Sequence, residues 1–116
     1  MTTEDRYLIE NAAKAMGYKG KWLLPPNWKK DLFLVDGYGE FNPLTSNADC
    51  AKMCDQLEID VIWLDHRKQV QALKSNEMED DWIEALEPYG TDKAPARRRA
   101  STRVAAEMGK LNGKTV

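Results

Sequence analysis

The chain has 116 residues, of which 42% are hydrophobic and 31% charged, and its formal net charge is −2 at pH 7. This length and balance predict a single globular domain with its own hydrophobic core, and they exclude a long disordered chain. The slight negative charge excludes a general attraction to nucleic acid or to an anionic membrane, so binding of that kind would need a local basic patch.

The chain contains no long apolar stretch. Its longest apolar runs, residues 32–35 and 62–64, are far shorter than the ~20 residues that cross a bilayer. The first residues lack the basic start and apolar stretch of a secretory signal. We therefore expect the protein to stay in the cytoplasm of the cell that makes it, where Cys50 and Cys54 remain reduced.

The N-terminal part of the chain is predicted to form one helix followed by short strands. Residues 3–16 follow Thr2, a residue type that caps helices, and begin with an acidic first turn. Their apolar residues recur at helical spacing, and Gly17 supplies a left-handed stop. Residues 20–44 mix apolar clusters with prolines and glycines, which is typical of short strands joined by turns.

The second predicted helix is the best marked in the sequence. Ser46 or Asn47 supplies its N-cap, and Asp49 lies three residues after Ser46, as in a capping box. Its apolar positions recur at helical spacing on one face: Cys50, Met53, Cys54 and Leu57. Both thiols are therefore expected in the core.

The second half of the chain begins with a predicted hairpin. Residues 59–64 read as a strand whose second face is also largely covered, and a polar turn at 65–68 leads into a second strand at 69–73. In residues 77–87 helical and strand periods conflict. An edge strand is favoured there, and a helix is the alternative.

A third helix is predicted near the C-terminus. Asp92 caps it, and Pro95 is tolerated in its first turn. Its core-facing stripe consists of Ala100, Val104, Met108 and Leu111. Residues 113–116 are expected to form a flexible tail.

Together these elements predict one α+β domain over residues 1–112. A small antiparallel β-sheet covered by helices, an α-β-α sandwich in the order α-β-β-α-β-β-(β)-α, accounts for the pattern.

The sequence contains no clear catalytic or metal-binding motif. The single histidine, His66, lies in a charged turn without the second histidine or cysteine pair of a zinc site. Cys50 and Cys54 have no base beside them, as expected of inert core thiols. The segment Gly37-Tyr38-Gly39 lacks the Lys-Ser/Thr ending of a phosphate loop and is interpreted as a turn. We predict no catalytic residues, no metal and no cofactor.

One basic cluster is a candidate binding site: Arg97, Arg98, Arg99 and Arg103. These arginines are close to the positive end of the third helix, so an anion should compensate them. The acidic segment just before the helix is one candidate. A phosphate-bearing ligand or nucleic acid is the other.

Aromatic and acidic residues are the remaining candidates. Trp22, Trp28 and Tyr38 surround a proline turn, where they either cap the core or serve to stack on a base or anchor a partner. The acidic run of residues 77–87 is either a solvated sheet edge, a source of paired carboxylates for acid–base chemistry or Mg²⁺, or an imitation of nucleic-acid phosphates. The acids at its centre are Glu79, Asp80 and Asp81.

Four short segments share a pattern with a known group of proteins. They are residues 12–17 (Ala-Ala-Lys-Ala-Met-Gly), 41–49, 59–64 and 103–109 (Arg-Val-Ala-Ala-Glu-Met-Gly). In these segments the chain resembles small bacteriophage and prophage proteins of the phage ABA sandwich family and the similar NinX-like proteins. The resemblance implies a sheet sandwiched by helices and a phage accessory role, and it brings no catalytic residues. The acidic insertion and the triple arginine depart from the family pattern, which puts a shared ligand in doubt.

The preferred hypothesis from these observations is a non-enzymatic phage accessory protein in the host cytoplasm that binds a host macromolecule. Such binding would block a defence or redirect a host enzyme. The first alternative is a binder of a small phosphorylated ligand such as a nucleotide signal, with arginines on the phosphates and aromatic rings against the base. The second is a nucleic-acid-binding module that uses the arginines of the third helix.

Overall fold

The computed structural model describes residues 1–23, 31–76 and 81–114, which form helices and two antiparallel three-stranded sheets. The elements, in chain order, are α1 (Thr3–Ala15), β1 (Gly20–Leu23), β2 (Leu32–Val35), β3 (Gly39–Glu40), α2 (Asn47–Leu57), β4 (Asp60–Leu64), a short 3-10 turn η1 (Asp65–Arg67), β5 (Gln69–Asn76), β6 (Asp81–Pro88) and α3 (Ala94–Lys114). The predicted α+β class and element order are confirmed. The strands divide into two sheets, β1-β2-β3 and β4-β5-β6, a division that the sequence pattern did not reveal.

The helix termini follow their local sequence signals. The backbone N–H of Asp5 donates to Thr2 Oγ1 at 3.0 Å, and that of Asp49 donates to Ser46 Oγ at 3.1 Å, so both predicted N-caps are confirmed. Gly17 ends the first helix with φ +74°, as predicted. The second helix ends at Leu57, and its C-cap Glu58 is a non-glycine residue in the left-handed region with φ 56°, which no residue preference predicted.

The third helix begins as predicted and extends further than predicted. The backbone N–H of Ala94 donates to Asp92 Oδ1 at 3.1 Å, so Asp92 caps the first N–H of the helix from one position before the N-cap residue Lys93. The helix then continues through Lys114, into the segment expected to be a tail. No helix among the described residues is both long and apolar enough to span a bilayer.

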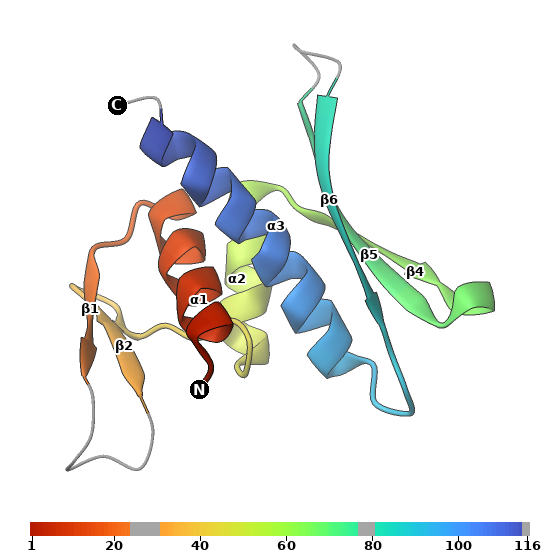
Figure 1. Cartoon of the computed structure of the whole chain (residues 1–116), viewed down its shortest axis with the longest axis horizontal. Coiled ribbons are helices and arrows are strands. Elements are labelled where there is room, and N and C mark those ends of the chain that lie inside the picture. Colours follow the sequence, from red (N-terminus) through yellow and green to blue (C-terminus); the bar gives the residue numbers. More distant parts are fainter. Residues whose placement is uncertain (24–30, 77–80, 115–116) are drawn as a thin grey trace.

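The helices lie between the two sheets (Figure 1). The α1 and α3 helices cross closely because Gly109 has no side chain: a Cβ atom there would lie 1.8 Å from the carbonyl oxygen of Asn11. Small and branched side chains fill this crossing and are fully buried, among them Ala12, Ala105 and Val104. The β4-β5-β6 sheet packs on the other side of α3, and β1-β2-β3 lies beyond α1.

The register of the β4-β5-β6 sheet separates its residues into two faces. Ala72 pairs with both Val61 and Ala85, and all side chains in such a row point to the same side. Val70, Ala72 and Ala85 are buried against α3. The next row, Ile62, Gln71 and Leu86, therefore points away from the helices.

Candidate functional site

Two of the predicted arginines join α3 to α1 and β6. Arg99 places its guanidinium 3.0 Å from Asp5 Oδ1 and 3.3 Å from Glu4 Oε1, both in the first turn of α1. Arg103 forms an ion pair with Glu87 and donates to the backbone oxygen of Leu86 at 3.1 Å. The compensating anions therefore come partly from the acidic segment, through Glu87, and partly from the opposite end of the chain.

The other two arginines hold α3 against the start of α2. Arg98 donates to the carbonyl oxygen of Leu44 at 2.8 Å and to Asn47 Oδ1 at 2.7 Å, and Arg97 donates to the same Asn47 oxygen at 3.2 Å. Arg97 Nε is buried without a hydrogen-bond partner. These contacts favour a structural role for the arginine cluster.

The pKa of Asp5 reflects its contact with α3. Desolvation by partial burial raises it, but the hydrogen bond and charge of Arg99, together with the Thr2 cap, outweigh that effect and lower the pKa below its ordinary value. Asp5 is thus held in its charged form by the guanidinium of α3.

Several predicted binding residues are outside the part of the chain that the structure describes. Trp28, Glu79 and Asp80 are among them. Asp81 is the first residue of β6, and its side chain is not described. The favoured interpretation of this segment as an edge strand is confirmed for residues 81–88, since β6 pairs only with β5 in the described sheet.

Tyr38 lies at a polar and aromatic junction near α2. Its ring stacks on Tyr18 with centroids 5.2 Å apart, and its hydroxyl donates to the carboxylate of Asp49. That hydrogen bond, helped by burial and by the charge of Asp49, raises the pKa of Tyr38 to about 12. Asp49 also accepts the backbone N–H of Asn42 at 2.9 Å. Its carboxylate therefore bonds outside the helix, and the predicted capping box is corrected to a single Ser46 cap.

Trp22 has a different environment from Tyr38. Its ring packs on Phe33 at a centroid distance of 5.0 Å, and its indole N–H donates to Glu10 of α1. Among the described rings, the contacts of Trp22 and Tyr38 are with different partners, so they do not form one aromatic cluster. Trp22 instead forms part of the wall between α1 and β1.

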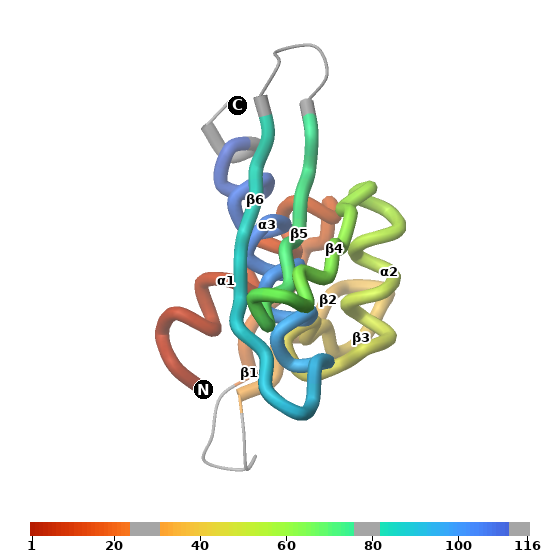
Figure 2. The backbone as a smooth tube through the Cα atoms, turned by 90° about the vertical axis from the view of Figure 1, so that its right-hand side faces the viewer, coloured from red at the N-terminus to blue at the C-terminus, as the bar shows by residue number. Residues whose placement is uncertain are grey.

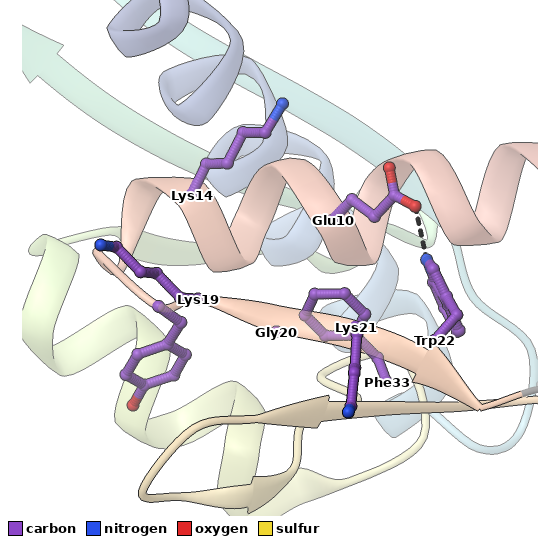
Figure 3. A pocket seen from close by; sticks show the side chains of 8 residues that line it. Glu10, Lys14, Lys19, Gly20, Lys21, Trp22 and Phe33 are labelled. Carbon is purple, nitrogen blue, oxygen red and sulfur yellow. Dashed lines mark hydrogen bonds between the residues drawn. The ribbon is translucent and has the colours of Figure 1, made fainter.

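A cavity of about 440 Å³ lies between α1 and β1 (Figure 3). Trp22 and Phe33 supply its aromatic surface. The Phe33 ring can lie against β1 because residue 20 is a glycine: a Cβ atom there would lie 2.7 Å from that ring. The polar residues of its lining are Glu10, Lys14, Tyr18, Lys19 and Lys21. Sequence reasoning missed these lysines, although their nearness to Trp22 along the chain was a usable signal.

The outward face of the β4-β5-β6 sheet carries several exposed apolar residues among polar ones. Ile62 and Leu86 retain 40% and 39% exposure, and Trp82, which pairs with Ser75 on the same face, retains 58%. Figure 2 shows the sheet in front of the helices, with this face toward the viewer. The expectation that the second face of residues 59–64 is largely covered is therefore wrong for the chain by itself. We call Ile62, Leu64, Leu73, Trp82 and Leu86 the outer apolar face.

The two thiols are close together at the contact between α2 and α3. Cys50 is buried and Cys54 is partly buried, beside Ser101 and Arg97. The hydrogen bond from Cys50 is the largest cause of a lowered Cys54 pKa, with further help from Ser101 and Arg97. His66 is in the exposed turn η1, on another part of the molecule. Within the described residues no group of three or more histidine, cysteine, aspartate or glutamate side chains is arranged to hold a metal ion.

Comparison with known proteins adds no relative: no family model, no curated protein and no solved structure matches the chain. The candidate functions therefore depend on the geometry of the chain itself.

Proposed function

We propose that this protein is a non-enzymatic accessory protein that binds a protein partner through its outer apolar face. The observation that carries the proposal is the row Ile62–Gln71–Leu86, in which two of three cross-strand neighbours are large apolar residues exposed by about 40%. Large apolar side chains exposed on the two sides of Gln71 favour an interaction surface over a solvated sheet face.

The charge around the face indicates the chemistry of the partner. Asp60 and Glu84 pair with Leu73 on its two neighbouring strands. This row is two residues from the row of Ile62, so both carboxylates are on the same face of the sheet as Ile62. An interface with an apolar centre and an acidic border is complementary to an apolar surface bordered by lysine or arginine. The proposed partner therefore carries a basic rim.

The choice of a host protein as the partner comes from the sequence pattern alone, which resembles phage accessory proteins in residues 12–17, 41–49, 59–64 and 103–109. The arginines bond within the fold, so we propose the outer apolar face, and not the arginine cluster, as the binding surface. A protein that blocks a host defence or redirects a host enzyme needs an interaction surface and no reactive centre.

The test is affinity capture from host lysate with variants of the face. The double variant Ile62→Lys and Leu86→Lys places two charges at the centre of the face without burying them. Leu111→Lys is the matched control: Leu111 was predicted in the core-facing stripe of α3, but it is 43% exposed, similar to Ile62 and Leu86. We expect a stoichiometric protein partner for the unmodified chain and for Leu111→Lys, and its loss in the double variant.

Two results would contradict the proposal. One is a partner that the double variant still captures, which would place the interface elsewhere. The other is a stable homodimer in light scattering that the double variant converts to a monomer, which would assign the face to self-association.

A further inference from the structure

We propose that the cavity between α1 and β1 binds a small molecule that combines a flat ring with an anionic group, the chemistry of a mononucleotide. This site is separate from the outer apolar face and does not depend on the function proposed above.

The size and lining of the cavity fit a ring. Its volume of about 440 Å³ falls in the range of about 300–1,000 Å³ that small-molecule sites occupy. Trp22 and Phe33 are in contact, and their carbon surfaces line the same cavity (Figure 3). Aromatic walls of this kind favour a planar ring over a flexible chain, because stacking adds to simple burial.

The charges around the cavity fit an anion. Lys14, Lys19 and one carboxylate, Glu10, line it, so two positive charges and one negative charge give a net charge of +1. Lys21 also lines it, but its side chain points to the sheet face opposite Trp22 and Phe33. Within the described residues no ion pair involves any of these lysines. Figure 3 shows that the three side chains leave the lining in different directions, so their flexible stems would have to turn for the ammonium groups to meet one phosphate.

Glu10 supplies a second polar contact at the aromatic end. It points toward Trp22 and accepts the indole N–H, which fixes both side chains (Figure 3). A carboxylate has further acceptor capacity, so it can also accept an N–H from the ring of a ligand. A ring with an exocyclic amino group and a phosphate thus meets an acceptor and a set of cations in one cavity.

The test is a titration followed by heteronuclear NMR, which reports the site as well as the affinity. The probes are AMP, CMP, GMP and UMP, with adenosine and inorganic phosphate as partial ligands. We expect at least one mononucleotide to shift the Trp22 indole and Gly20 amide resonances, with affinity at least tenfold above adenosine and above phosphate. Raising the ionic strength should weaken binding severalfold, because the lysines are exposed.

Variants place the site. Lys14→Gln with Lys19→Gln should weaken mononucleotide binding at least tenfold, and Trp22→Leu should do the same without changing the salt dependence. Arg67→Gln with Lys68→Gln is the control, since it removes the same charge from the turn after β4, on the far side of the molecule. Circular dichroism spectra and thermal midpoints show whether each variant is folded.

Each other outcome overturns part or all of the proposal. Adenosine that binds as tightly as AMP removes the anion site, and phosphate that binds as tightly as AMP removes the ring site. Equal loss of affinity in the lysine variant and in its control shows general charge attraction only. No shift of Trp22 or Gly20 with any nucleotide at ~5 mM overturns the proposal as a whole.

Discussion

Single residues without large side chains decide how closely the helices pack. At Gly109 the carbonyl oxygen of Asn11 occupies the space of a side chain, and the backbone nitrogen of Ala15 lies 3.1 Å from the same Cβ position. The sequence predicted that α3 packs through a stripe of apolar residues, but it gave no sign that Gly109 touches the backbone of α1. A glycine inside a helix lowers helix stability, so the sequence alone gives no reason for Gly109. The reason is the close contact with the backbone of α1, which only the folded structure shows.

The first prediction concerns this contact. Gly109→Ala should gain about 1 kcal/mol in helix propensity, but the methyl group has to push two helical backbones apart. We expect the free energy of unfolding to fall by about 2–4 kcal/mol, since overpacking against backbone is relieved poorly. Urea denaturation measures it. Gly90→Ala is the control, because nothing lies within 4 Å of its Cβ position, and an equal effect in both variants would contradict the steric argument.

At the scale of elements, local sequence signals were sufficient to predict where the helices begin, but not which residues they contact in the fold. Thr2, Ser46 and Asp92 each marked a helix start correctly because a cap acts over only a few residues. The partners of Arg99 could not be found in this way. Asp5 is at the other end of the chain, and only the packing of α3 on α1 brings the two side chains together.

The second prediction follows from the contact between these helices. Arg99→Gln removes the guanidinium that lowers the pKa of Asp5, and we expect a loss of about 1 kcal/mol in the free energy of unfolding at pH 7. Because the pKa of Asp5 is lowered on folding, its contribution is present above its unfolded pKa of about 4 and disappears as the pH falls through the lower folded value.

Urea denaturation at pH 7 and at pH 2 separates this charge effect from a packing effect. The difference between the unmodified protein and Arg99→Gln should shrink at the lower pH, and Arg67→Gln, an exposed charge change in η1, should cause little difference at either pH. A difference that stays constant with pH would show that Arg99 acts by packing its side chain.

At the scale of the whole molecule, the sequence described the strands better than their assembly. Alternation identified the hairpin of β4 and β5, and it assigned apolar residues to both faces, which in a single covered sheet would be buried on both sides. The structure places helices on one face only, so Ile62 and Leu86 are left exposed. The division into two sheets depends on tertiary packing, and it is this division that separates the cavity of β1 from the outer apolar face.

The third prediction is that the two proposed sites act independently. They belong to different sheets on opposite sides of the helices and share no side chain, and sites of that kind have nearly additive free energies (Figure 1). Ile62→Lys with Leu86→Lys should therefore leave nucleotide affinity within about twofold, and Lys14→Gln with Lys19→Gln should leave partner capture unchanged. Leu111→Lys should affect neither. A tenfold change in nucleotide affinity in the Ile62→Lys, Leu86→Lys variant would contradict this prediction. It would show that the helices between the sheets couple the two sites, since no direct contact joins them.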